Sequence, residues 1–225
     1  MPRAPSAETP AAARRRAAEI LIRLRREYPE AVCELDFSTP LQLAAAAILS
    51  AQCTDKRVNL VTPALFRKYK TPRDWADTPQ ETLEAEIRST GFFRNKATNI
   101  RGLMRRLADD FGGRLPDDFD ILVTLPGIGR KTANLLMAEA FGRPGMIVDT
   151  HCTRLSQRLG FTKATDATKI EMELRALIPE PDWTAWSHRM VFHGRYCCAA
   201  RRPECERCPL TDLCPFFAAE RKPRA

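Results

Sequence analysis

Hydrophobic residues recur every three or four positions along most of the chain, and the strict alternation typical of strands is not found. The segments with this period include "LQLAAAAILSAQ", "ETLEAEIRSTG", "KATNIRGLMRRLADDFG" and "TKIEMELRALIP". A spacing of three or four places apolar side chains on one face of a helix. The pattern therefore predicts an all-α fold with short and numerous helices.

Several residues mark where these helices begin and end. Thr78, Pro79 and Glu81 form a capping-box pattern that predicts a helix beginning at Pro79. Gly91 and the pair Gly112–Gly113 predict helix ends, because glycine adopts the backbone conformations that stop a helix. The sequence has no regular repeat and no flexible linker, so any two domains should pack against each other.

The two ends of the chain differ from its middle. Residues 1–13 are rich in Ala and Pro and lack hydrophobic periodicity, which predicts a disordered tail before a helix that contains Ile20, Leu21 and Leu24. The remaining face of that helix is rich in Arg, and it could contact phosphate or be a solvated surface. Residues from about 219 to 225 are short and basic, and we expect them to be disordered as well.

Charge narrows the class of partner. The 225 residues include 36 Lys and Arg against 28 Asp and Glu, a net charge of +8 with a pI near 9.3. Such a balance favours a partner with dense negative charge, with nucleic acid the leading candidate, although a protein with solvated basic faces has the same composition. Charge alone leaves both readings open.

The hydropathy of the chain bears on its location. The N-terminus has no continuous apolar core of the kind found in a secretory signal, and Glu8 and Glu19 disfavour an organelle transit peptide. The longest apolar run, residues 43–49, is far shorter than the roughly 20 residues that a membrane-spanning helix needs. We therefore expect an intracellular protein that does not enter a membrane.

The strongest local pattern is a run of cysteines near the C-terminus. Four of them follow the spacing C-x6-C-x2-C-x5-C, namely Cys198, Cys205, Cys208 and Cys214. In an intracellular protein, four thiolates on one compact loop predict a metal centre rather than two disulfides. Zinc and a [4Fe-4S] cluster both take four sulfur ligands, and the spacing also permits Cys197 to replace its neighbour. Cys33, Cys53 and Cys152 are expected to be small packing residues.

A second pattern is the glycine-containing segment "LPGIGRKTANLLMAEAFG", residues 125–142. We expect Gly127 and Gly129 to take backbone conformations closed to other residues and to form, with the helix that follows, a cradle of N–H donors for an anion. Arg130 could share a bound phosphate. The positive potential of the helix end and of Arg130 would favour the neutral amine of Lys131, and a neutral amine is a nucleophile. Asp149 lies before another helix, where an aspartate usually serves as an N-cap.

Taken together, Gly127, Gly129, Lys131, Asp149 and the four-cysteine run resemble the endonuclease III family of DNA glycosylases. The similarity covers most of the chain. It extends through "LSAQCTD" at residues 49–55, "TGFFRNKATNI" at 90–100, "VDTHCTRLSQRLG" at 148–160 and "HGRYCCAARRPECERC". The hairpin alone occurs in many DNA-binding proteins, whereas the ordered combination is specific.

The resemblance implies a helix-hairpin-helix fold in two parts. A six-helix domain would span residues 33–143, and an iron-sulfur cluster domain would combine residues 1–32 with 144–225. Double-stranded DNA containing oxidised pyrimidines or abasic sites would bind in a groove between them. The protein would remove the damaged base and then cut 3′ to the abasic site by β-elimination. We expect a monomer that works on DNA inside the cell, in the cytoplasm or nucleoid if the source is bacterial.

The resemblance also implies individual roles. Lys131 corresponds to the Schiff-base nucleophile and Asp149 to the essential carboxylate, while Cys198, Cys205, Cys208 and Cys214 correspond to the ligands of a [4Fe-4S] cluster and Cys197 does not. Gln52 and His151 match positions near the opened duplex, and Phe92 falls where the family often has an aliphatic wedge. Arg201 and Arg202, between the first two cysteines, could clamp a phosphate or could simply keep that loop soluble. With the hairpin residues, the residues expected to contact DNA are Gly127, Gly129, Arg130, Gln52, Phe92, His151, Arg201 and Arg202.

Two alternatives remain at this stage. A monofunctional relative of the adenine-mismatch type would use the carboxylate but lacks the hairpin lysine, and Lys131 argues against it. A non-catalytic helix-hairpin-helix DNA-binding protein with a structural metal would use Lys131 only to touch phosphate. Cleavage at an abasic site separates these classes of protein.

Overall fold

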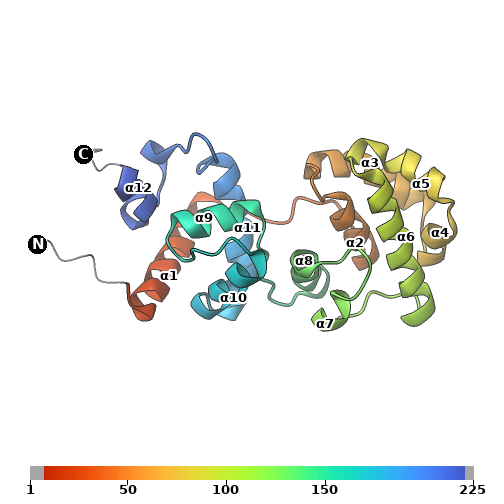
Figure 1. Ribbon diagram of the computed structural model, residues 1–225, viewed down its shortest axis with the longest axis horizontal. Coiled ribbons are helices and arrows are strands. Elements are labelled where there is room, and N and C mark those ends of the chain that lie inside the picture. The colour runs from red at the N-terminus through yellow and green to blue at the C-terminus, as the bar shows by residue number, and fades with distance from the viewer. Residues whose placement is uncertain (1–7, 221–225) are drawn as a thin grey trace, which may run out of the picture. The chain divides into compact units, whose positions relative to one another are not determined.

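The computed structural model describes residues 8–220, and every regular element among them is helical (Figure 1). The predicted all-α class is confirmed. None of the described helices has the length and apolar character needed to cross a membrane. The chain separates into two compact units: residues 33–143 form one, and the described residues up to 32 combine with those from 144 onward to form the other.

The unit of residues 33–143 contains six helices of at least six residues and one single-turn helix, α7. They are α2 (Pro40–Leu49), α3 (Asp55–Lys68), α4 (Pro72–Asp77), α5 (Gln80–Ile87), α6 (Phe93–Asp110), α7 (Phe119–Leu122) and α8 (Arg130–Phe141), with the 3-10 turn η1 (Arg88–Thr90) before α6.

The core of this unit is built around α2 and α6. All residues of α2 from Leu43 to Leu49 are buried, and the helix packs against α3, α6 and α8. Helix α6 buries a single stripe against α4 and α5, made of Lys96, Ala97, Ile100, Leu103, Met104 and Leu107. Spacings of three and four make this stripe continuous, as the sequence pattern predicts. Its first member, Lys96, is the one charged residue in it.

The second unit is formed by α1 (Pro10–Glu27), α9 (Thr150–Arg158), α10 (Ala167–Leu177), α11 (Trp183–Tyr196) and α12 (Pro215–Glu220), with 3-10 turns η2 (Glu180–Asp182), η3 (Cys205–Arg207) and η4 (Thr211–Leu213). Helix α11 packs against α9 and α1. One apolar cluster joins these helices, with Ile20, Leu24, Leu155, Leu174 and Trp186 among its buried members. Chain segments from both ends of the sequence therefore share one core.

Two predicted helix limits are wrong. Helix α1 begins at Pro10, inside the tail expected over residues 1–13, because Thr9 Oγ1 accepts a hydrogen bond from the Ala12 amide at 3.2 Å and caps the helix. At the other end, α12 includes residues 219 and 220. The expected tails at residues 1–7 and 221–225 lie outside the described residues.

The capping box predicted at Thr78 is also wrong. Thr78 Oγ1 donates to the carbonyl of Asp74 at 2.8 Å, at the end of α4, and α5 begins at Gln80 without a side-chain cap. The capping box is formed instead by Thr71 and Asp74 at the start of α4. The predicted stops are correct, since α6 ends directly before Phe111 and Gly112, and Gly91 precedes it.

Candidate active site and metal centre

The segment "LPGIG", residues 125–129, forms a tight turn directly before α8. The Ile128 amide donates to the Leu125 carbonyl at 3.1 Å, and both side chains are buried. Gly127 lies between them with a φ of +75°, and a Cβ added there would lie 2.9 Å from the Cβ of Asn99. Backbone conformation and space both require glycine at this position, as predicted.

Gly129 does not have the restricted conformation that the sequence suggested. Its φ of −90° and ψ of 176° are ordinary extended values, and a Cβ added there would meet no atom within 4 Å. The prediction of a conformation closed to other residues is therefore wrong for Gly129. The space beside it is open, at the point where α8 begins.

The first turn of α8 combines backbone donors with two cations. Gly129 is the N-cap and provides no side-chain acceptor, so the positive potential of the helix end is not offset by a capping side chain. The Arg130 guanidinium lies over the Phe119 ring, 4.8 Å from its centroid. Lys131 is exposed. The start of α8 therefore combines backbone N–H donors, open space at Gly129 and the exposed amine of Lys131.

Lys131 also has carboxylates in its electrostatic surroundings. The pKa of the Cys33 thiol is raised to about 11, mainly by burial; the carboxylates of Glu139 and Asp55 contribute to the rise, and the charge of Lys131 opposes it. All three charges therefore act on one partly buried thiol. Sequence reasoning did not single out Asp55 or Glu139, although Asp55 ends the "LSAQCTD" motif.

Asp149 belongs to the other unit and is the N-cap of α9. Its Oδ1 accepts a hydrogen bond from the Cys152 amide at 2.7 Å, which supports the expected capping role. The side chain is half-buried. The cap occupies one carboxylate oxygen, and the other makes no hydrogen bond to any residue between 8 and 220. A fixed carboxylate with a free oxygen is therefore available at the start of α9.

His151 is held in the first turn of α9 by a close contact with α11. Its Nδ1 lies 3.2 Å from Nη2 of Arg154, which donates to the Gly194 carbonyl at 2.8 Å. A Cβ added at Gly194 would lie 2.8 Å from the same Nδ1. Gly194 therefore allows the two helices to approach closely enough to position His151.

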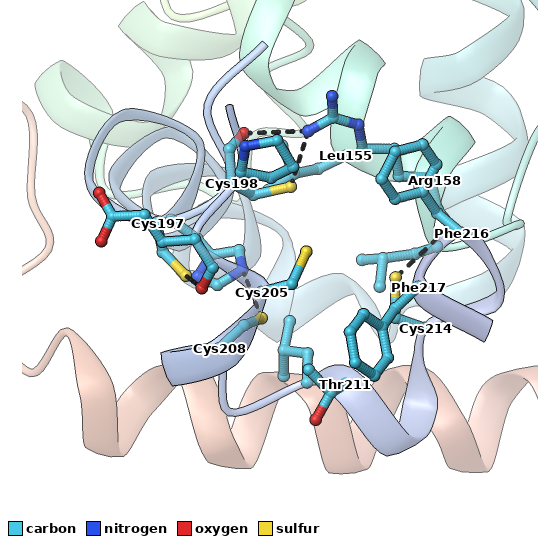
Figure 2. A pocket seen from close by; sticks show the side chains of 15 residues that line it. Leu155, Arg158, Cys197, Cys198, Cys205, Cys208, Thr211, Cys214, Phe216 and Phe217 are labelled. Atoms are coloured by element: carbon cyan, nitrogen blue, oxygen red, sulfur yellow. Dashed lines mark hydrogen bonds between the residues drawn. The ribbon is translucent and has the colours of Figure 1, made fainter. Parts of the chain in front are cut away.

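The four predicted ligand cysteines line one pocket, shown in Figure 2. None of the cysteines is in a disulfide. Apolar side chains complete the lining, among them Leu155, Leu159, Leu210, Phe216 and Phe217. Burial raises the pKa of the Cys208 thiol to about 12, so a thiolate there needs a neighbouring positive charge. Four soft sulfur donors in an apolar pocket fit an iron-sulfur cluster, whose metal supplies that charge.

Arg158, at the end of α9, fixes the loop that carries the first ligand. Its Nη1 lies 3.1 Å from the Cys198 sulfur and donates to the Ala199 carbonyl at 2.8 Å, and its Nη2 donates to the Ala200 carbonyl at 2.8 Å. The guanidinium also lies 4.6 Å from the centroid of the Phe216 ring. Figure 2 shows Arg158 at the rim of the pocket beside Cys198. Sequence reasoning missed this residue because its partners are backbone carbonyls.

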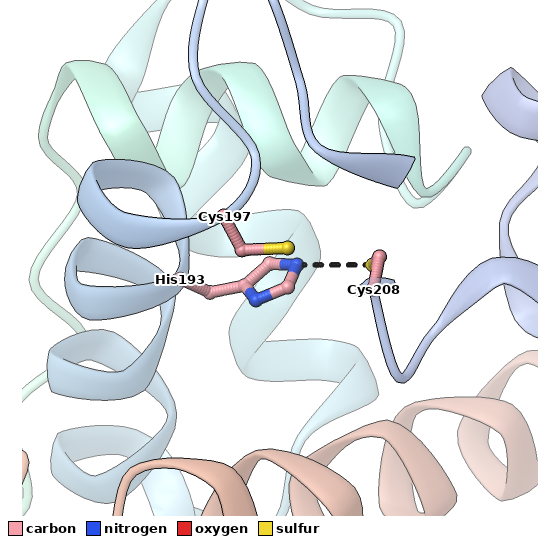
Figure 3. Close-up of side chains that lie close together, drawn as sticks. All are labelled: His193, Cys197 and Cys208. Carbon is pink, nitrogen blue, oxygen red and sulfur yellow. Dashed lines mark hydrogen bonds between the residues drawn. The ribbon is translucent and has the colours of Figure 1, made fainter. Parts of the chain in front are cut away.

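Cys197 lines the same pocket as the four predicted ligands. It is buried, and its sulfur lies 3.7 Å from the Glu204 carbonyl. His193, Cys197 and Cys208 place their ligand atoms within 4.8 Å of one another (Figure 3). His193 Nε2 lies 3.5 Å from the Cys208 sulfur, and its Nδ1 lies 3.1 Å from the Tyr28 hydroxyl. His193 therefore lies between the Tyr28 hydroxyl and the sulfur of one predicted ligand, Cys208.

The remaining predicted contacts are exposed. Arg201 and Arg202 stand in the loop between Cys198 and Cys205, and neither forms an ion pair with another described residue. In the first unit, Gln52 and Phe92 are exposed and have positive φ values of 52° and 47°. They are the two non-glycine residues with positive φ among the described residues. Lys131 and Asp149 lie in different units.

Comparison with known proteins defines the class of this helical protein. Residues 45–180 match the HhH-GPD superfamily of base excision DNA repair proteins, and residues 198–214 match the iron-sulfur binding domain of endonuclease III.

Individual relatives narrow the class to one family. Endonuclease III from Synechocystis is 53% identical over 93% of this chain and 96% of its own length. The solved structure of a non-covalent endonuclease III–DNA complex has a TM-score of 0.88 and 45% identity over 92% of this chain and 97% of that chain. A trapped endonuclease III–DNA covalent intermediate gives the same TM-score and identity, over 92% of this chain and 98% of that chain.

This chain belongs to the endonuclease III family. It is a base-excision repair enzyme with DNA glycosylase and AP lyase activities, and its cofactor is a [4Fe-4S] cluster. The alternatives of a non-catalytic DNA-binding protein and of a monofunctional adenine-mismatch enzyme are therefore set aside.

Proposed function

We propose that the enzyme removes oxidised pyrimidines from duplex DNA with Lys131 as the nucleophile and Asp149 as the essential carboxylate. The observation that carries this proposal is the exposed Lys131 amine in the first turn of α8, at a helix end without a capping side chain and beside an open space at Gly129. An amine placed there can reach a sugar whose phosphate is held by the same turn.

Phosphate binding at the hairpin needs no sequence information. The amides that begin α8 face an anion with the positive end of the helix dipole, and the open position beside Gly129 lets a DNA backbone approach closely. Arg130 remains stacked on Phe119 and adds positive charge at the same end. Arg201 and Arg202 are proposed to contact a second stretch of backbone from the loop of the metal centre.

The chemical steps follow from the amine. The nitrogen lone pair of neutral Lys131 forms a bond to the deoxyribose C1′, and the glycosidic bond breaks with its electron pair leaving on the base, which takes up a proton. Loss of the amine proton and opening of the sugar ring give an iminium between Lys131 and C1′. Removal of a C2′ proton then breaks the C3′–O bond, and the phosphate leaves with that electron pair. Water releases the lysine.

Asp149 is proposed to stabilise the positive charge that develops at the sugar. Its Oδ1 is held by the Cys152 amide, while its other oxygen is free to face the substrate. A carboxylate fixed by a cap needs no reorientation as the charge develops. Capping and catalysis are therefore compatible in one side chain.

Cys198, Cys205, Cys208 and Cys214 would hold the [4Fe-4S] cluster, whose iron would bind the four thiolates and so fix the C-terminal loop. The chain's own residues then do the positioning: Arg158 ties the Cys198 loop to α9, and that loop presents Arg201 and Arg202. We assign the cluster to structure and DNA positioning rather than to hydrolysis. As part of the same proposal, the enzyme works as a monomer on DNA inside the cell.

The test is a panel of otherwise identical duplexes that carry different damaged bases or an abasic site, with borohydride added during turnover. We expect a covalent protein–DNA adduct on oxidised pyrimidines and abasic sites. Lys131→Ala should abolish the adduct, whereas Lys70→Ala, which removes an exposed lysine of the same unit, should not. An undiminished adduct with Lys131→Ala would remove the assignment of the nucleophile.

A further inference from the structure

Lys96 is a buried cation in an otherwise apolar helix stripe. It lies in the first turns of α6 and its side chain is 3% exposed. Residues on this stripe pack into the core of the unit, where an unpaired charge is costly. Its position therefore requires compensation by polar partners within the unit.

The partners of Lys96 are two backbone carbonyls, each at the C-terminal end of a different helical segment. Its Nζ donates to the carbonyl of Leu49 at 2.7 Å and to the carbonyl of Thr90 at 2.8 Å, and both hydrogen bonds are buried. Leu49 is the last residue of α2, whose carbonyl lacks a partner within the helix and carries negative partial charge. Thr90 ends η1. One ammonium group thus holds two chain segments together.

Each of these segments leads into an exposed residue with unusual backbone geometry. Gln52 follows Leu49 by three positions with a φ of 52°, and Phe92 follows Thr90 by two positions with a φ of 47°. Phe92 is 63% exposed. Positive φ is unfavourable for both residue types, so surrounding structure must hold each tip in place. Lys96 is hydrogen-bonded to the backbone three residues before Gln52 and two residues before Phe92.

We propose that Lys96 is a positioning residue that fixes the Gln52 and Phe92 loops relative to each other, so that the two side chains enter the duplex together. This inference rests on the proposed function, in which Gln52 and Phe92 contact the opened duplex. Extruding a nucleotide requires that the space it leaves be filled in register. Because Lys96 hydrogen-bonds to the backbone before both Gln52 and Phe92, it can keep the two side chains at a fixed distance from each other.

The test compares two substrates with the same protein preparation. The first is a duplex in which an oxidised pyrimidine is fully paired, and the second has the same lesion in a small bubble of unpaired nucleotides. Lys96→Met removes the donors while keeping a long apolar side chain. We expect its single-turnover base release on the paired duplex to fall by about tenfold or more. On the bubble the loss should be less than about threefold, because extrusion is already complete there.

The ratio of the two rates is independent of the fraction of folded protein, so partial misfolding alone leaves it unchanged. The matched control is Lys68→Met, which removes an exposed lysine from the same unit and should alter neither rate. If Lys96→Met gives no folded protein, Lys96→Gln, which keeps a donor but shortens the reach, should show the same selective loss. Equal losses on both substrates would overturn the inference.

A second readout follows the tips directly. A fluorescent 2-aminopurine placed opposite an unreactive abasic analogue brightens when it is unstacked. Lys96→Met should bind this duplex within about threefold of the wild-type affinity, because phosphate contacts are retained, yet produce less fluorescence at saturation. Full brightening by Lys96→Met would also overturn the inference.

Variants of the tips separate this inference from the proposed function. Phe92→Ala and Gln52→Ala should each lower the rate on the paired duplex, and adding Lys96→Met to Phe92→Ala should cost less than it does alone, since coupled residues are non-additive. If neither tip variant affects the paired duplex, the proposed DNA contacts are wrong. If both tip variants lower that rate but the effects of Lys96→Met and Phe92→Ala are additive in the double variant, only the proposed role of Lys96 is wrong.

Discussion

The Oδ1 atom of Asp149 accepts a hydrogen bond from the backbone amide of Cys152 at 2.7 Å. Asparagine caps helices about as well as aspartate, so Asp149→Asn should change the free energy of unfolding by less than about 1 kcal/mol. Loss of the charge should lower single-turnover base release by about 100-fold or more. Thermal denaturation and a rapid-quench assay measure the two effects.

Asp166 provides the matched control for this variant. It caps α10 in the same way, accepting from the Lys169 amide at 2.8 Å, and is exposed. Asp166→Asn should change the free energy of unfolding by less than about 1 kcal/mol. Its rate of base release should stay within about twofold of the wild-type rate. Near-normal base release by Asp149→Asn would leave that carboxylate with its capping role alone.

The two hairpin glycines should respond differently to alanine. Gly127→Ala places a Cβ 2.9 Å from that of Asn99 at a φ of +75°, and should lower the free energy of unfolding by at least about 2 kcal/mol. Gly129→Ala meets no atom within 4 Å and should stay within about 0.5 kcal/mol of wild type.

Among folded molecules, the affinity for DNA should fall more with Gly129→Ala than with Gly127→Ala. Gly129→Ala fills the open space where the backbone is proposed to approach and should weaken affinity for an abasic-site duplex. Urea denaturation and equilibrium binding at fixed salt measure stability and affinity. Unchanged affinity in Gly129→Ala would place the phosphate elsewhere.

Adjacent cysteines test the ligand set of the metal centre. Cys198→Ser should abolish the brown visible absorbance of the cluster, because Cys198 lines the pocket with the other three ligands. Cys197→Ser should retain it: Cys197 lines the same pocket, but its sulfur already has the Glu204 carbonyl as a partner at 3.7 Å and lies outside the C-x6-C-x2-C-x5-C spacing. Iron content and the visible spectrum of each purified variant decide. A reversed result would assign Cys197 as the ligand.

Arg158→Met should loosen the metal centre without removing a ligand. Four hydrogen bonds to the Cys198 loop are lost, which should lower stability by about 1–3 kcal/mol and speed bleaching of the cluster by an iron chelator. Arg25→Met, which removes an exposed ion pair with Asp182 in the same unit, should cost less than about 1 kcal/mol. Equal bleaching rates for the two variants would contradict the anchoring role.

The features predicted well from the sequence are those set by local pattern. Helical periodicity predicted the all-α class, and the cysteine spacing predicted residues that line one pocket. The turn at Gly127 was predictable because its positive φ follows from the hairpin itself. The capping motif was ambiguous, because Thr71 and Thr78 are both followed by proline and, three positions on, by an acidic residue. In the structure Thr71 forms the capping box, whereas Thr78 hydrogen-bonds to the end of α4.

The features that were missed depend on contacts between distant segments. Lys96 binds carbonyls 47 and 6 positions away, and Arg158 binds carbonyls about forty positions along the chain. Backbone acceptors leave no mark in the sequence. A signal for Lys96 was nevertheless present: it stands four positions before Ile100 on the apolar stripe of α6, where a charged residue needs a special reason.

Helix α9 joins the proposed catalytic carboxylate to the loop of the metal centre. Asp149 caps its first turn, and Arg158 at its last turn grips the loop of Cys198, a separation of roughly 14 Å along a rigid rod. If Asp149 is the essential carboxylate, one short helix joins it to the loop that holds Cys198. Loss of the metal would then free the end of α9 opposite to the carboxylate, although no metal ligand lies on this helix.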